Sequence, residues 1–123
     1  MRKSFIAVSL LSLALTACGN PDTPGGRAAD ARHESFEELG NAMKAAGDEL
    51  KKSGPDMAVV RTNADKINEL AGKLPTWFPA GSGPQDGMKT DALEAVWAKP
   101  AEFKQAADNF TAEAAKFQTA AVN

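Results

Sequence analysis

Apolar residues recur at alternating steps of three and four along three long segments of the chain. In residues 30–52 they are Phe36, Leu39, Met43, Ala46 and Leu50. Residues 55–74 repeat the alternation at Met57, Val60, Ala64, Ile67, Ala71 and Leu74, and residues 100–121 at Phe103, Ala107, Phe110, Ala114, Phe117 and Ala121. This spacing places each set on one face of an amphipathic helix. We therefore predict an all-α protein, an antiparallel up-and-down bundle of three helices.

A long connection separates the second and third predicted helices. Three Pro and three Gly fall within residues 75–87, so a helix cannot continue through this stretch. A loop of this length is uncommon in a compact domain and either packs through its own side chains or carries function. We predict a crossover loop that Trp77 and Phe78 anchor to the bundle.

The chain between this loop and the third long helix carries a weaker helix signal. Asp91 is followed three residues later by Glu94, a pair typical of a helix start. The pattern predicts a short helix that buries Leu93 and Trp97 before Pro100 opens the next helix.

The N-terminus has the pattern of an export signal. Two cationic residues precede an apolar run over residues 5–15, which is shorter than the roughly 20 residues that span a bilayer. Residues 15–18, Leu-Thr-Ala-Cys, resemble the lipobox of bacterial lipoproteins, in which the signal is removed before the Cys and acyl chains are attached there. The alternative is an ordinary secretory signal with an incidental Cys.

The lipoprotein interpretation divides the chain into three parts. It predicts a signal peptide over residues 1–17, lipidation of Cys18, a flexible tether over residues 18–30 and a helical domain over residues 31–123. The membrane is then a partner through the lipid anchor, and the localisation is the periplasm.

Composition excludes several classes of function. The chain has 14 Lys and Arg against 16 Asp and Glu, one Cys and one His. Its acidic balance argues against nucleic acid as a partner. One Cys and one His can form neither a disulfide within the chain nor a thiolate or His-rich metal centre, so no metal ligand is assigned. We find no catalytic constellation and expect no enzyme.

A family resemblance rests mainly on the loop. Its residues are Trp77-Phe78-Pro79, Gly81-Ser82-Gly83-Pro84, Lys89-Thr90, Trp97 and Pro100-Ala101, with Arg32, Gly40 and Ala42-Met43-Lys44 in the first helix. Together they resemble class II cytochromes c, the cytochrome c prime family. The resemblance implies a periplasmic four-helix bundle whose haem c is held covalently by a C-terminal Cys-x-x-Cys-His.

The resemblance also implies roles for two residues of the first helix. Arg32 matches an Arg that lies near a haem propionate, with a solvated surface charge as the equal alternative. Phe36 matches the position that faces the vacant side of the haem, and a Phe cannot coordinate iron. Met43 and Met57 are interpreted as packing residues, and His33 as a surface residue near a helix start.

The chain departs from the family in lacking Cys-x-x-Cys-His, because its one Cys is Cys18. We expect three helices of a four-helix bundle, either a fragment without the haem-attachment helix or a shortened haem-free relative. The expected function is electron transfer or small-gas binding with a redox partner. The alternative is a haem-free, membrane-tethered interaction lipoprotein, whose open apolar face a homodimer would close.

Overall fold

The computed structural model describes residues 21–122. Three long helices account for most of this range: α1 (Pro24–Leu50), α2 (Met57–Lys73) and α4 (Pro100–Val122). Three shorter elements lie between α2 and α4: η1 (Leu74–Trp77), η2 (Pro84–Asp86) and α3 (Ala95–Ala98). Residues 21–122 contain no strand, and the all-α prediction is confirmed.

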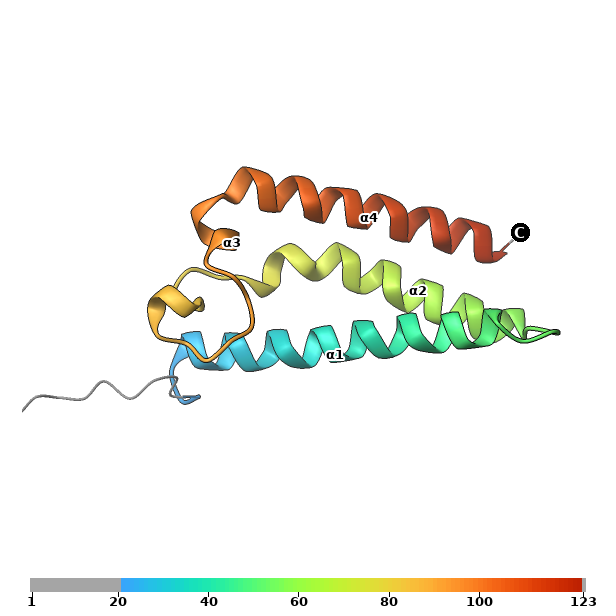
Figure 1. Cartoon of the computed structure of the whole chain (residues 1–123), viewed down its shortest axis with the longest axis horizontal. Helices are drawn as coiled ribbons and strands as arrows, with labels where there is room; N and C mark the ends of the chain where they lie inside the picture. The colour runs from blue at the N-terminus through green and yellow to red at the C-terminus, as the bar shows by residue number, and fades with distance from the viewer. Residues whose placement is uncertain (1–20, 123) are drawn as a thin grey trace, which may run out of the picture.

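The long helices form an up-and-down bundle (Figure 1). Helices α1 and α4 run in the same direction, and α2 runs back between them and packs against both. The start of α1 and the crossover loop share one end of the bundle, whereas the α1–α2 turn and the end of α4 share the other. The predicted topology is therefore correct.

The core follows the predicted stripes over much of their length. The main cluster of buried residues comprises Leu39, Ala42, Ile67, Leu70, Ala71 and Ala114, with Trp77, Phe110 and Phe117 packed against it. A second cluster, Val60, Ala64 and Ala121, lies toward the α1–α2 turn. The buried residues of α4 are Ala107, Ala114 and Ala121. Their small side chains let α4 approach α2 closely, while the half-buried Phe110 and Phe117 fill the space beside this contact.

The first helix begins earlier than predicted, which corrects the boundary of the tether. Helix α1 starts at Pro24, so residues 24–30 are helical and do not belong to the flexible segment predicted over 18–30. Thr23 caps the helix, its side-chain oxygen accepting from the backbone N–H of Gly26 at 3.0 Å. Pro24 occupies the first helical position, which tolerates its missing N–H. The predicted signal peptide and Cys18 lie outside the described residues.

The predicted turn between the first two helices is present, although α2 begins at Met57 rather than at Pro55. Asp56 caps α2 by accepting from the N–H of Ala58 at 2.9 Å. Glu49, only 8% exposed, accepts the N–H of Asp56 at 2.8 Å and pairs with Lys52 at 2.6 Å. A nearly buried carboxylate therefore joins the end of α1 to the start of α2.

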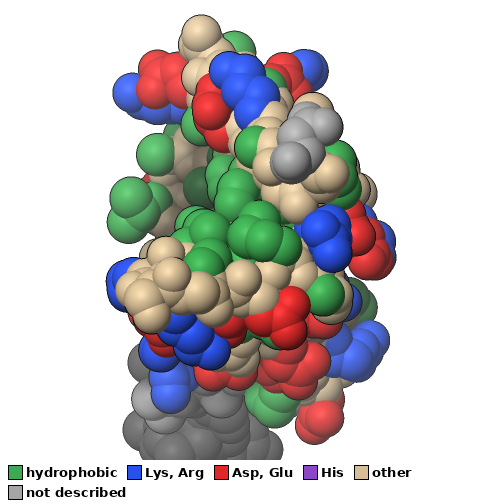
Figure 2. All heavy atoms as spheres, turned by 90° about the vertical axis from the view of Figure 1, so that its right-hand side faces the viewer, with side chains coloured by type: hydrophobic (Ala, Val, Ile, Leu, Met, Phe, Trp, Pro, Cys, Tyr) green, Lys and Arg blue, Asp and Glu red, His purple; other side chains and the backbone are tan. Residues whose placement is uncertain are grey.

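Part of the predicted core is exposed. On α1, Phe36 is 41% exposed, Met43 51% and Leu50 46%, and Met57 at the start of α2 is 37% exposed. In the end-on view of Figure 2, hydrophobic side chains gather in the middle of the molecule and continue toward a hollow at its left side. No long helix within residues 21–122 covers Phe36, Met43 and Leu50, although loop residues contact one side of Phe36. We call these three residues the exposed α1 stripe. This exposure agrees with the predicted open apolar face of a three-helix bundle. The packing role predicted for Met43 and Met57 is not met within residues 21–122.

The short helix before α4 also differs from its prediction. Helix α3 begins only at Ala95, and Asp91 does not cap it; Thr90 instead accepts from the N–H of Ala92 at 3.2 Å. Leu93 is 73% exposed rather than buried, because it precedes the helix and lies outside its packed face. Trp97 is half-buried, as its position within α3 allows.

Candidate functional site

Arg32 fastens the crossover loop to α1. One terminal nitrogen of its guanidinium donates to the carbonyl oxygen of Trp77 at 3.1 Å and to Oγ of Ser82 at 3.0 Å. The other donates to the carbonyl oxygen of Ser82 at 2.9 Å and to Oγ1 of Thr90 at 2.8 Å. These bonds use all four terminal N–H groups of the fork. The loop from residue 77 to residue 90 is thus gathered around one side chain.

The charge of Arg32 is buried without a carboxylate. The residue is 3% exposed, and among residues 21–122 it forms no ion pair with Asp or Glu. Its guanidinium carbon lies 5.0 Å from the ring centroid of Phe78 and 5.4 Å from that of Trp97, a cation–π arrangement. Burial lowers the pKa of Arg32 from its ordinary value, yet an Arg stays protonated in proteins. The alternative of a solvated surface charge is therefore wrong.

Aromatic side chains from α1, the loop, α3 and α4 meet beside Arg32. Phe36 lies edge-on to Trp77, with centroids 5.1 Å apart, and to Phe78, at 6.2 Å. Phe78 contacts Trp97 at 5.8 Å and Phe103 at 4.9 Å. These T-shaped contacts are a preferred geometry for aromatic pairs. The three predicted loop anchors, Trp77, Phe78 and Trp97, all lie in this cluster.

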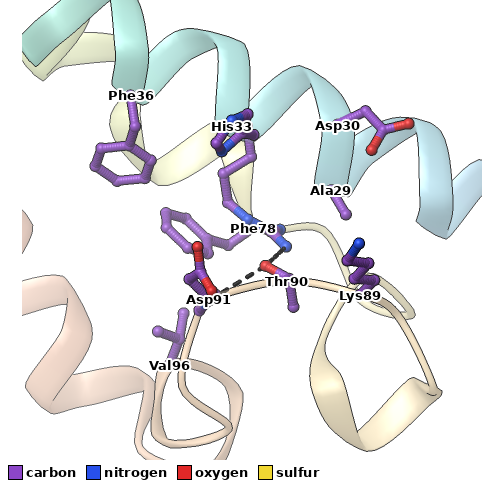
Figure 3. A pocket seen from close by; sticks show the side chains of 11 residues that line it. Ala29, Asp30, His33, Phe36, Phe78, Lys89, Thr90, Asp91 and Val96 are labelled. Atoms are coloured by element: carbon purple, nitrogen blue, oxygen red, sulfur yellow. Dashed lines mark hydrogen bonds between the residues drawn. The ribbon is translucent and has the colours of Figure 1, made fainter. Parts of the chain in front are cut away.

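A pocket of about 660 Å³ opens between α1 and the loop. Its lining residues are Ala29, Asp30, Arg32, His33, Phe36, Phe78, Lys89, Thr90, Asp91, Ala92 and Val96. Figure 3 shows Phe36 and Phe78 side by side toward one end, with Asp30 of α1 opposite Lys89 of the loop toward the other. The pocket therefore joins an apolar, aromatic wall to a polar wall that carries Lys89 and the carboxylates of Asp30 and Asp91.

The pocket offers no convincing ligand for iron. His33 lines it, but the imidazole side chain is 68% exposed and lies 3.4 Å from Glu37, one helical turn away. Cys is absent between residues 21 and 122, and no cluster of three metal-ligating side chains occurs there. Met43 and Met57 do not line the pocket. The described residues therefore offer an aromatic wall to a flat group such as haem, but supply neither its thioether bonds nor an axial ligand.

Two residues that complete the site, Ser82 and Thr90, were not predicted as site residues. Ser82 has no exposed surface. Its hydroxyl accepts a hydrogen bond from Arg32 and donates one to the carbonyl oxygen of Pro79 at 2.7 Å. One signal was available: Arg32 lies seven residues before Leu39 and so on the buried stripe of α1, where a cation needs several acceptors. Which loop atoms provide them depends on the loop path, which spacing does not specify.

The fold is a helical bundle with an aromatic-walled pocket at one end, and sequence comparison identifies the family. The model of the family described as Cytochrome C′ matches residues 27–123. The chain belongs to this family. The matched range includes Arg32, Phe36 and the entire crossover loop.

Two curated relatives have the same kind of name. A cytochrome c-554 of Cereibacter sphaeroides is 28% identical over 118 residues, covering 94% of this chain and 77% of the relative. Another cytochrome c-554 from that organism is 32% identical over 97 residues, covering 77% of this chain and 73% of the relative. No solved structure matches the chain significantly. The family and these relatives support a haem-type electron-transfer protein, and the family implies covalently bound haem c.

Within residues 21–122, no helix is both long enough and apolar enough to cross a membrane.

Proposed function

We propose that this chain forms the distal wall of a periplasmic cytochrome c′-type haem protein that transfers electrons or binds a small gas. The observation that carries the proposal is the buried charge of Arg32, which lacks a carboxylate and lines a pocket walled by Phe36 and Phe78. A buried cation is costly unless an anion compensates it. A haem propionate is the anion that the family resemblance assigns to this position.

Each side chain of the wall has a distinct task in this proposal. Haem, when bound, supplies a one-electron iron couple. Phe36 and Phe78 exclude water from the apolar end of the pocket and provide ring faces and edges for a flat ligand. Phe36 carries no donor atom for iron, so this chain leaves that side without a protein ligand, as binding of a small gas requires. The role is that of a carrier rather than an enzyme.

A fourth helix is the second part of the proposal. The exposed α1 stripe and the half-buried Phe110 and Phe117 present apolar surface on one side of α2. A helix that carries Cys-x-x-Cys-His would cover this surface and hold the haem, which makes the 123 residues a fragment of the working protein. The share of the two curated relatives that the chain covers, 77% and 73%, leaves room for such a helix.

Attachment to a membrane is the third part. The resemblance of residues 15–18 to a lipobox supports export and acylation of Cys18. Several acyl chains give stable anchoring, because each buried methylene contributes about 0.8 kcal/mol. Export also delivers the chain to the periplasm, where the resemblance places haem attachment and where we expect a redox partner.

The test of haem binding starts from the complete native gene, expressed in a host with haem-attachment machinery. The purified protein is expected to show a Soret band, and denaturation in acid acetone should leave the haem on the polypeptide. Arg32→Gln should shift the reduction potential of this protein, whereas Arg61→Gln, on the exposed face of α2, should not. Absence of the Soret band would overturn the proposal.

A haem-free interaction lipoprotein is the second candidate function. It is favoured by the exposed α1 stripe and by the lack of Cys among residues 21–122. In this form a second copy of the chain closes the apolar face, so the protein should be a concentration-dependent homodimer without Soret absorbance. A monomeric haem-free protein at high concentration would contradict it.

A further inference from the structure

We infer that the lipid anchor holds the bundle with its crossover-loop end against the membrane, so that the pocket opens close to the lipid surface. The inference rests on the proposed acylation of Cys18 and adds an orientation to it. Its structural basis is the early start of α1, which leaves only residues 19–23 between the anchor and the first helix.

The short connection limits how far the bundle can move from the bilayer. At about 3.3–3.6 Å per residue, the steps from Cys18 to Pro24 span at most about 20 Å even when fully extended. A tether over residues 18–30 would have allowed roughly twice that distance. The segment that connects the anchor to α1 is therefore shorter than the helix, since the 27 residues of α1 extend about 40 Å.

The start of α1 packs against the crossover loop. The segment from Cys18 therefore connects to the loop end of the bundle. Gly25 packs so closely on Gly81 that a Cβ at position 25 would overlap the carbonyl oxygen of Gly81. The hydroxyl of Thr23 also lies 3.9 Å from the sulfur of Met88. These contacts hold the start of α1 against the loop, and Figure 1 shows the start of α1 and the loop at the same end of the bundle.

The pocket belongs to this end as well. Its α1 residues lie between Ala29 and Phe36, which places them about 8–18 Å along the helix axis from Pro24. Leu93 is 73% exposed, the most of any large hydrophobic residue between 21 and 122. It lies on the chain just before α3, which Figure 1 also places at this end. An exposed Leu suits a lipid headgroup region better than open water. A redox partner of this pocket must then lie in or next to the same membrane.

The orientation can be tested by energy transfer from the protein to labelled lipid. The full-length acylated protein is placed in vesicles of phosphatidylethanolamine and phosphatidylglycerol that carry an acceptor on the headgroup. Acylation consumes the thiol of Cys18, so a Cys introduced by Gln85→Cys in η2 or by Ser53→Cys in the α1–α2 turn takes the donor dye alone. Both positions are exposed, and they lie at opposite ends of the bundle.

We expect several-fold more efficient transfer from position 85 than from position 53. A flexible Gly/Ser insert of about 20 residues between Asn20 and Pro21, with a mean span of about 25 Å, should remove most of the difference. Equal transfer from both positions in vesicle-bound protein would overturn the orientation. Mass spectrometry that finds Cys18 unacylated, with no protein on the vesicles, would instead overturn the anchor proposed above and this inference with it.

Discussion

Arg32 and Ser82 are 50 positions apart in the chain and form two hydrogen bonds with each other. The guanidinium of Arg32 donates to Oγ of Ser82 at 3.0 Å and to its carbonyl oxygen at 2.9 Å. Both residues are almost completely buried. Because Arg32 belongs to α1 and Ser82 to the crossover loop, this pair fixes the loop that forms one wall of the pocket.

Removal of the Arg32 side chain should destabilise the protein. Arg32→Ala leaves the buried acceptors of Ser82 and Trp77 without donors, at a cost of about 1–3 kcal/mol for each unsatisfied group. We expect the free energy of unfolding to fall by roughly 2–4 kcal/mol in urea titrations followed by circular dichroism. Arg61→Ala is the matched control on an exposed face, and should change it by less than about 0.5 kcal/mol.

Arg32→Lys gives a finer test of the hydrogen-bond fork. Lys keeps the charge but cannot reach four acceptors in the planar arrangement that the guanidinium makes. The variant should lose most of the stability that Arg32→Ala loses. Full stability of Arg32→Lys would contradict the role of the fork.

Two glycines of α1 should respond to alanine in opposite directions. At Gly25 a Cβ would overlap the carbonyl oxygen of Gly81, so Gly25→Ala must push the helix start and the loop apart. At Gly40 nothing lies within 4 Å of the added atom, so Gly40→Ala should stabilise the helix by about 0.5–1 kcal/mol. Thermal unfolding of both variants checks this, and a stabilised Gly25→Ala variant would contradict the docked helix start.

The sequence was informative where a local rule decides the structure. Steps of three and four residues predict the three long helices, and Pro100 marks the start of α4, because a buried stripe and a missing N–H act within one helix. The start of α1 was misplaced because Gly25 looks like a helix breaker, whereas its value lies in the close approach of Gly81, 56 positions away.

The site was harder to predict than the fold for the same reason. Arg32 and Phe36 were identified through the family resemblance, but the atoms that surround Arg32 come from a loop whose path no periodicity describes. Hydrophobic spacing places Phe36, Met43 and Leu50 on one face of α1, but it does not show which segment covers that face.

Charges on the exposed α1 stripe should reveal what covers it. If α1, α2 and α4 fold without a cover, Met43→Glu with Leu50→Glu should lower binding of a hydrophobic dye and any dimer fraction, with little change in unfolding free energy. If a fourth helix packs there, the same double variant of the complete protein should be destabilised by several kcal/mol. Ala45→Glu, also exposed on α1, is the matched control. Unchanged dye binding and stability in both forms would contradict an apolar docking face.

The α1–α2 turn should be sensitive to acid through Glu49. The hydrogen bond from Lys52, followed by that from the backbone N–H of Asp56, lowers the pKa of Glu49 from its ordinary value of 4.5. Stabilisation by the carboxylate is therefore fully present above about pH 4.5 and is lost as the pH falls toward the lowered folded-state pKa.

Glu49→Gln should flatten this dependence. The unfolding free energy of the variant should be lower than that of the wild type at neutral pH and fall less steeply below about pH 4.5. Glu34→Gln, on the exposed part of α1, is the control and should keep the wild-type slope. Parallel curves for Glu49→Gln and the wild type would contradict a special role for this carboxylate.

Mass spectrometry of the intact protein, made from the complete native gene in cells that attach haem, measures directly whether haem is covalently bound. We expect one haem on each polypeptide, on a segment that packs against the exposed α1 stripe. A polypeptide mass without haem, from cells that load a control cytochrome c, would contradict it.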